Sequence, residues 1–264
     1  MTIPIPSQAL ILAAGLGTRL APVTDFIPKP LVPFFGVPLI DCAVLRLVRA
    51  GVDRIAINTH HLASQMETYI REQLATRFAS VEFHVVQEPV IRGTGGAISN
   101  LRSWFDRRAF WVVNSDAVFL QDLTAIAKAH NLNDSQATLM VSRHERHRDM
   151  RFLKVDHDGG LVSRLPEARD SGFVFCGIHL NNWEILSILP QQGMSCVLRQ
   201  GHLPWVEQGG RVRVFESEDF WADLGTPERY LEAHYHAYPY LSRWIDEGLF
   251  SPARMDSLQS LRGH

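Results

Sequence analysis

In Leu10-Ile-Leu-Ala-Ala-Gly-Leu-Gly-Thr-Arg-Leu-Ala-Pro-Val-Thr24, and in Pro28-Lys-Pro-Leu31 close behind it, the chain shows its most informative pattern. The apolar residues from 9 to 14 predict a buried strand, which runs into a loop containing Gly15 and Gly17. Because glycine has no Cβ, the backbone of such a loop can approach a phosphate closely, and successive N–H groups can point at the anion. The pattern therefore predicts a strand followed by an anion-binding loop.

Two cations accompany this loop. Arg19 offers a planar set of donors, and Lys29 offers a compact point charge. A dinucleotide fingerprint would need glycine at the position of Leu20, and a P-loop would need Gly-Lys-Ser/Thr, which Gly17-Thr18-Arg19 does not supply. A strand that feeds a glycine loop beside two cations suits a triphosphate. For the stretch taken alone, a plain structural turn is the alternative.

Composition narrows the class of protein. With 264 residues, 46% of them hydrophobic, the chain can form one large domain with a sizeable core. Its net charge of -2 provides no basic field for nucleic acid or an acidic membrane, and no apolar run is long enough to span a bilayer. Cys42, Cys176 and Cys196 show neither metal spacing nor a disulfide framework. We therefore expect a cytoplasmic protein with no nucleic-acid and no membrane partner.

Apolar β-rich runs alternate with helical patterns through the first half of the chain. The expected strands after the first are 54–58, 81–86 and 109–113, and the expected helices are 39–50, 62–78 and 97–104, with Ser64 as a candidate cap of the second helix. This order predicts a mostly parallel sheet with helices on both faces, and ligands beyond the carboxyl ends of its strands. The glycine loop after Leu12 and the segment Asn114-Ser115-Asp116 both fall at those ends.

The second half changes character. Residues 136–142, 152–156, 173–180 and 212–216 predict strands in a more antiparallel and turn-rich arrangement, and residues 226–248 predict a helical tail. We therefore expect an α/β fold, with a three-layer core around a Rossmann-like mixed sheet.

Two carboxylates occupy informative positions. Asp116 follows an apolar strand, and a carboxylate beside a phosphate loop suits Mg²⁺, which takes one or two carboxylates together with phosphate oxygens and water. The structural alternative for Asp116 is an Asx-turn or a helix N-cap. Asp223 precedes a helix start, where Thr226 as N-cap and Pro227 at the first helical position leave the carboxylate itself unexplained.

A third glycine-rich segment, Gly93-Thr-Gly-Gly-Ala-Ile98, leads into a helix, and its three glycines suit close approach by a flat ligand such as a base. Taken together, these motifs resemble those of the nucleotide-sugar pyrophosphorylases, the NTP:sugar-1-phosphate nucleotidyltransferases. Further matches are Asn114-Ser-Asp, Phe175-Cys-Gly-Ile and Trp221-Ala-Asp-Leu-Gly-Thr-Pro, in family order over residues 10–230. The resemblance implies the nucleotide-diphospho-sugar transferase fold and a single domain. Its parts would be a nucleotide-binding core at about 8–135, a smaller sugar-binding lobe at about 136–225 and a C-terminal helical tail at 226–264.

The resemblance also implies a reaction: an NTP and a sugar 1-phosphate give an NDP-sugar and pyrophosphate, with Mg²⁺ as cofactor. The sugar phosphate attacks the α-phosphorus in line, so catalysis is mostly positioning and charge neutralisation. By the same resemblance, Arg19 and Lys29 hold the phosphates, and Asp116 and Asp223 hold Mg²⁺. The residues implied for the nucleotide are Leu12, Ala13, Ala14, Gly15, Gly17, Thr18, Gln87, Gly93, Thr94, Gly95, Gly96 and Asn114, and those implied for the sugar are Arg151, Glu167, Cys176, Gly177 and Trp221.

One position departs from the family pattern. Many members carry Glu-Lys-Pro near the sugar, and the equivalent here, Arg164-Leu165-Pro166, lacks the lysine. Arg164, Arg151 or a member of the basic cluster 143–148 are the candidates to replace it, while a solvated loop is the alternative for that cluster. Among the branches of the family, the chain resembles N-acetylmuramate 1-phosphate uridylyltransferase best, with the mannose- and heptose-1-phosphate guanylyltransferases close behind.

Other functions stay open. A catalytically silent homologue that binds a nucleotide sugar would be expected to lose Arg19, Lys29, Asp116 or Asp223, and all four are present. A cytidylyltransferase for a non-sugar phosphate such as phosphocholine would share the fold. A homodimer is compatible with family habit and with the aromatic tail.

Overall fold

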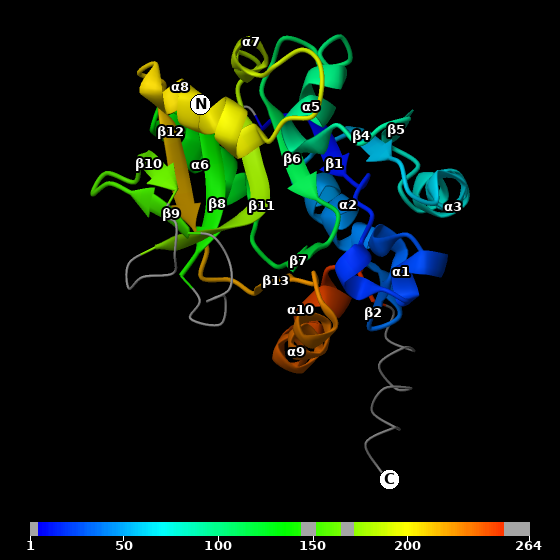
Figure 1. The fold of residues 1–264 in the computed structure, drawn as a ribbon. Helices are drawn as coiled ribbons and strands as arrows, with labels where there is room; N and C mark the ends of the chain where they lie inside the picture. Colours follow the sequence, from blue (N-terminus) through cyan, green and yellow to red (C-terminus); the bar gives the residue numbers. More distant parts are fainter. Residues whose placement is uncertain (1–4, 144–151, 165–171, 251–264) are drawn as a thin grey trace.

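The computed structural model of the protein describes residues 5–143, 152–164 and 172–250. A nine-stranded mixed sheet forms its middle layer (Figure 1). The parallel strands β5 (Glu82–Gln87), β4 (Arg54–Thr59), β1 (Gln8–Leu12) and β6 (Phe110–Asn114) lie side by side in that order. This arrangement confirms the parallel sheet expected from the first half of the chain.

The second half of the chain extends the same sheet. Strand β11 (Phe173–Asn181) pairs antiparallel with β6, β8 and β9, and β12 pairs parallel with β8. The strands added here are β8 (Ala137–Ser142), β9 (Phe152–Val155), β10 (Leu161–Arg164) and β12 (Val212–Glu216). The antiparallel character expected for this half is confirmed, apart from the parallel β8–β12 pair. The proposed lobe boundaries stay predictions.

Side-chain alternation explains the three layers. Along β1, Ala9 and Ile11 point into one hydrophobic cluster and Leu10 into another, because successive residues of a strand face opposite sides of a sheet. The first cluster packs against α2 (Leu39–Arg49), α3 (Ala63–Tyr69), α6 (Leu123–Leu132), α9 (Pro227–Ala237) and α10 (Leu241–Asp246). The second packs against α5 (Gly93–Asn100), α7 (Ile185–Ile188), η5 (Leu198–His202) and α8 (Leu203–Glu207). The predicted three-layer α/β fold is therefore confirmed.

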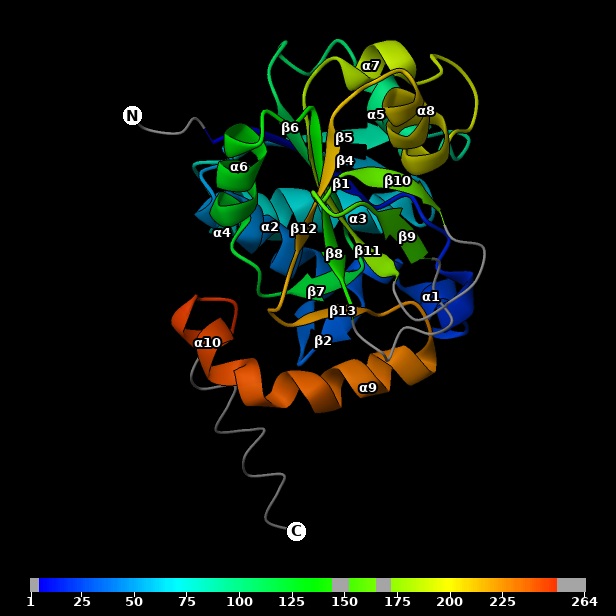
Figure 2. The same ribbon diagram turned by 90° about the vertical axis from the view of Figure 1, so that its left-hand side faces the viewer.

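Short elements complete the chain. They are η1 (Thr18–Leu20), α1 (Val23–Phe26), η2 (Lys29–Leu31), the β2–β3 hairpin (Pro33–Phe34 and Val37–Pro38) and η6 (Tyr238–Tyr240). Strands β7 (Ala117–Phe119) and β13 (Trp221–Asp223) form a separate two-stranded sheet, which we call the aspartate ribbon. Helix α9 runs beneath this ribbon, at the end of the molecule opposite α7 and α8 (Figure 2). Among the described residues, no helix is long and apolar enough to cross a membrane.

Three local predictions need correction. The helix expected over 62–78 consists of α3, a π-helical turn η3 (Ile70–Leu74) and α4 (Ala75–Arg77). Ser64 does not cap it, because Leu62 holds the N-cap position in a left-handed conformation with φ of 51°, without a side-chain cap. The helix expected to begin at Ala97 begins at Gly93, so the glycine segment forms its first turn. At the tail, by contrast, Thr226 Oγ1 accepts a hydrogen bond from Arg229 N at 3.3 Å, which confirms the predicted cap.

Candidate active site

The loop after β1 turns sharply at Gly17. Its φ of 68° is left-handed, and a Cβ at this position would lie 2.9 Å from Thr24 Cγ2. Thr24 Oγ1 donates a hydrogen bond of 2.9 Å to the Gly17 carbonyl, which holds the turn closed. Glycine is therefore required here by both the backbone conformation and the packing. At Gly15, in contrast, an added Cβ would have no heavy atom within 4 Å.

A buried polar network supports this loop from below. Ala13 N donates to Asn58 Oδ1 at 2.8 Å, and Asn58 Nδ2 donates to Glu88 Oε1 at 2.9 Å. The other Glu88 oxygen accepts from Arg92 N at 2.9 Å, just before α5 begins. Asn58 and Glu88 are 4% and 2% exposed, so this chain of bonds joins the loop after β1 to the loop before α5. Neither residue was predicted from the sequence, although each is a polar side chain at or just after the end of a predicted strand.

A pocket of about 210 Å³ lies beyond the carboxyl ends of β1, β4 and β6. Most of its lining was predicted from the sequence, and Asn58, Glu88, Pro30, Ile91 and Ser115 are additions. The predicted residues that it brings together are Leu12, Ala13, Ala14, Gly15, Lys29, Gly93, Thr94, Asn114 and Asp116. The predicted nucleotide residues outside its lining are Gly17, Thr18, Gln87, Gly95 and Gly96.

The glycines of α5 have a packing role. A Cβ at Gly95 would lie 2.7 Å from Ser195 Oγ, and one at Gly96 would lie 2.8 Å from the Gly193 carbonyl. The two segments are joined by hydrogen bonds of 2.9 Å from Gly95 N to Ser195 O and from Val197 N to Thr94 Oγ1. Close packing against residues 193–197 thus accounts for Gly95 and Gly96, while their contact with a base stays a prediction.

The aspartate ribbon brings the two predicted carboxylates together. In the antiparallel register of β7 and β13, Asp223 lies opposite Ala117, the residue that follows Asp116. Leu224 N also donates to the Asp116 carbonyl at 3.3 Å. Two residues separated by more than a hundred positions therefore meet at one end of this ribbon. Asp116 lines the pocket beyond the carboxyl ends of β1, β4 and β6, and Asp223 lies outside its lining.

Cations surround the pair. Lys29 Nζ donates to Asp116 Oδ2 at 2.5 Å, and Arg229 Nη1 lies 3.2 Å from Asp223 Oδ2. A Cβ at Gly225 would lie 2.8 Å from Arg19 Nη2 and 2.6 Å from Asp223 Oδ1, so glycine leaves room for the guanidinium. The structure therefore places both predicted phosphate-binding cations at the two aspartates.

The electrostatic environment of Asp223 is unusual. Burial raises the pKa of its carboxyl, and the negative charge of Asp116 raises that pKa further. Lys29, Arg229 and Arg19 oppose this pKa shift. The pair is thus two carboxylates held close together against their mutual repulsion, a recurrent feature of functional sites.

The donor set fits a hard divalent cation. Within the described part of the chain, Asp223 Oδ1 is buried and has no hydrogen-bond partner, which is costly unless something else binds that oxygen. Two carboxylates with open positions for phosphate and water match what Mg²⁺ prefers. The described residues hold no group of three or more His, Cys, Asp or Glu side chains suited to a metal, so an all-protein cage such as Zn²⁺ takes is not seen there.

Of the five residues predicted for the sugar, the structure describes three, Cys176, Gly177 and Trp221. Gly177 has a φ of 74°, and a Cβ there would lie 2.3 Å from Asn114 Nδ2, in the stretch where the β8–β11 register shifts. Trp221 Nε1 donates to the carbonyl of Cys176 at 3.0 Å, which joins the aspartate ribbon to β11. Arg151 and Glu167 lie outside the described residues, as do residues 144–148 of the basic cluster. Arg143 pairs with Glu216 at 2.8 Å, with both side chains exposed.

Comparison with known proteins agrees with the class that this fold and site define, a nucleotidyltransferase of the α/β type. The Nucleotidyl transferase family matches residues 8–238, so the chain belongs to that family. Mannose-1-phosphate guanylyltransferase catalytic subunit beta from Xenopus tropicalis is 26% identical over 229 residues, covering 85% of this chain. Mannose-1-phosphate guanyltransferase from Emericella nidulans is 28% identical over 232 residues, also covering 85%.

The chain spans 62% of the length of these two relatives. A crystal structure of HddC from Yersinia pseudotuberculosis complexed with GMP-PN is 25% identical, with a TM-score of 0.72. The match covers 88% of this chain and 99% of the HddC chain. The family resemblance expected from the motifs is therefore confirmed.

Proposed function

We propose that this protein is a sugar-1-phosphate nucleotidyltransferase that transfers a guanylyl group from GTP to a sugar 1-phosphate and releases pyrophosphate. One observation supports the proposal: the aspartate ribbon holds Asp116 and Asp223 together beside the pocket after β1. Three cations lie next to this pair, Lys29, Arg19 and Arg229. An acidic pair among cations is what two anionic substrates and a divalent cation require.

In the proposed mechanism, the loop backbone at Ala14 and Gly15 binds the nucleotide, and the pocket holds its ribose and base. Lys29 and Arg19 neutralise the phosphates and orient the α-phosphate for in-line attack by the sugar phosphate. Asp116 and Asp223 would hold Mg²⁺, which when bound screens the repulsion between the two anions and stabilises charge on the phosphates. Because the nucleophile is already an anion, no side chain has to activate it as a base.

The choice of base rests on the relatives. The two curated relatives are named mannose-1-phosphate guanyl(yl)transferases, and the HddC structure contains GMP-PN. These names favour GTP and mannose 1-phosphate. A heptose 1-phosphate stays an alternative from the motif resemblance. Uridylyl transfer to N-acetylmuramate 1-phosphate, favoured by the motif resemblance, is the second candidate. The free state of Cys42, Cys176 and Cys196 supports a cytoplasmic location, and exposed Leu231 and Tyr235 on α9 are compatible with a homodimer contact.

The test is release of pyrophosphate with Mg²⁺, crossing GTP, UTP, CTP, dTTP and ATP with mannose, heptose, glucose and N-acetylmuramate 1-phosphates and with phosphocholine. We expect turnover with GTP and one sugar phosphate. Turnover with UTP and N-acetylmuramate 1-phosphate alone would reverse the choice of base. Activity with CTP and phosphocholine alone, or none with any pair despite nucleotide binding, would refute sugar-phosphate transfer among these substrates.

A further inference from the structure

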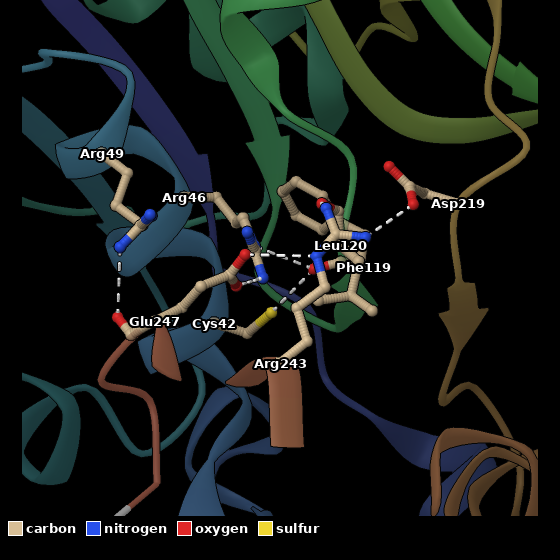
Figure 3. A network of polar contacts seen from close by, with 8 residues as sticks. All are labelled: Cys42, Arg46, Arg49, Phe119, Leu120, Asp219, Arg243 and Glu247. Atoms are coloured by element: carbon tan, nitrogen blue, oxygen red, sulfur yellow. Dashed lines mark hydrogen bonds and ion pairs between the residues drawn. The ribbon is translucent and has the colours of Figure 1, made fainter. Parts of the chain in front are cut away.

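The aspartate ribbon is held at its other end by a partly buried ionic network. Arg46 Nε, from α2, donates to the carbonyl of Phe119 at 3.1 Å, and Arg243 Nη2, from α10, donates to the carbonyl of Leu120 at 3.1 Å. Glu247 bonds both arginines, through its Oε2 to Arg46 and through its Oε1 to Arg243 at 3.3 Å. Figure 3 shows Glu247 close to Arg46 and Arg243, which both reach toward the end of β7.

The same network reaches the second strand of the ribbon. Arg243 Nη1 also donates to Asp219 Oδ1 at 2.8 Å, and Asp219 lies just before β13. At this end of the ribbon, Leu120 N donates a hydrogen bond of 2.9 Å to the carbonyl of Phe220, which joins the residue after β7 to the residue before β13. Arg243 thus contacts both strands where they leave the ribbon, while Asp116 and Asp223 sit at the opposite end.

Because the strands of the ribbon are short, the network that holds one end lies close to the two aspartates at the other end. Strand β7 has three residues, from Ala117 to Phe119, so the network lies roughly 10 Å from Asp116 along the backbone. A two-stranded sheet is marginal without further packing. The side chains of this ribbon pack in the first hydrophobic cluster, where Val118 and Phe119 are fully buried, and the polar network holds its end. The side chains of Arg46 and Glu247 are 5% and 12% exposed, so removal of one partner would leave the other charge largely buried and uncompensated.

We propose that Arg46, Arg243 and Glu247 are positioning residues, which set the spacing of Asp116 and Asp223 by fixing both strands of the aspartate ribbon. The proposal rests on the proposed function only in treating the two aspartates as cation ligands. The C-terminal helix α10 is then part of the site's support, although none of its residues lines the pocket. Groups that orient metal ligands from outside commonly alter metal affinity or activity by about 10–100-fold.

The chain offers a matched pair of variants. Arg243→Lys keeps the charge but loses the planar donors that contact Leu120, Asp219 and Glu247 together. Arg77→Lys is the control, because Arg77 donates to the carbonyls of Gly248 and Leu249 and to Asp41, and contacts no residue of the ribbon in the described structure. The arginine side chains are similarly exposed, at 41% and 34%.

The experiment measures Mn²⁺ affinity by electron paramagnetic resonance with GTP present, and kcat and KM by pyrophosphate release. For Arg243→Lys we expect Mn²⁺ binding about ten-fold weaker and kcat about ten-fold lower, with the KM for GTP within two-fold of wild type. Arg77→Lys is expected to leave Mn²⁺ affinity and kcat within two-fold. Glu247→Gln, a second variant that keeps the shape, is expected to weaken Mn²⁺ binding in the same direction.

Mn²⁺ affinity within two-fold of wild type in both Arg243→Lys and Glu247→Gln would overturn the proposal, as would equal losses in Arg243→Lys and Arg77→Lys. Binding of Mn²⁺ to wild type without any pyrophosphate release would refute the proposed function, and the Mn²⁺ comparison would still decide on positioning. Wild-type protein that binds no Mn²⁺ would overturn the positioning proposal itself.

Discussion

Replacing Lys29 by methionine tests the electrostatics of the site directly. The substitution keeps a long side chain of similar shape but removes the ammonium that contacts Asp116 at 2.5 Å and lowers the pKa of Asp223. Without that charge, the two carboxylates face each other with less compensation. We expect loss of activity by about 10²–10³-fold, the range seen when one preorganised group that stabilises transition-state charge is removed.

The stability cost follows from burial. The side chains of Lys29 and Asp116 are 10% and 28% exposed, so the pair lies between a surface ion pair and a buried one. An exposed pair contributes at most about 1 kcal/mol, and breaking a buried pair costs about 3–5 kcal/mol. We therefore expect Lys29→Met to lower the free energy of unfolding by about 2–3 kcal/mol, or the Tm by about 4–12 °C for a chain of this size.

The assay is thermal unfolding with and without Mg²⁺, alongside pyrophosphate release. Because the aspartates have lost their compensating cation, Mg²⁺ should raise the Tm of Lys29→Met more than that of wild type. Lys128→Met, at an exposed position of α6, is the control and should leave both readouts near wild type. A Tm for Lys29→Met within 2 °C of wild type, or turnover within three-fold, would refute this reasoning.

Two further predictions concern the core near the site. Gly177→Ala should lower the free energy of unfolding in urea by about 3 kcal/mol, because the φ of Gly177 is 74° and the new Cβ would lie 2.3 Å from Asn114 Nδ2. Gly209→Ala, with a φ of 85° and open space around the new Cβ, should lower it by only about 1 kcal/mol. Equal losses in the two variants would contradict the steric explanation. Burial lowers the pKa of His179 to about 4, below its unfolded value of about 6.5, so the unfolded state binds the proton more readily between these values and stability falls as pH falls through that window. The free energy of unfolding at pH 5 should be about 2 kcal/mol lower than at pH 8, and His179→Gln should weaken this pH dependence. A pH dependence that survives His179→Gln intact would contradict the assignment.

The parallel half of the fold was predictable because its signals are local. The apolar strands end at glycine or polar residues, and β1, β4 and β6 lie within a few residues of the expected ranges. The helix at 62–78 was harder, since its start at Leu62 depends on a left-handed residue that no cap signal marks, and its π-helical turn depends on packing. Local propensity alone does not specify either feature.

The site shows the same division. Asp116 and Lys29 lie in motifs that indicate phosphate and metal chemistry. Their residue types and their order along the chain were therefore sufficient to predict them as site residues. The Asn58–Glu88 bond and the Glu247 network join residues 30 and about 200 positions apart, and only the folded chain brings them together. The sequence indicated that Gly95 and Gly96 have a specific role. It did not indicate that residues 193–197 pack against them, because that contact forms only in the folded chain.

The central claim is that Asp116 and Asp223 act as one cation-holding pair for nucleotidyl transfer. The most direct measurement is a Mg²⁺-dependent single-turnover assay with labelled GTP and mannose 1-phosphate, or the pair found active in the substrate panel, on wild type, Asp116→Asn and Asp223→Asn. We predict that each variant stays folded by circular dichroism but loses at least about 100-fold in rate, and that the double variant loses little more. A single variant with a rate near that of wild type would contradict this claim.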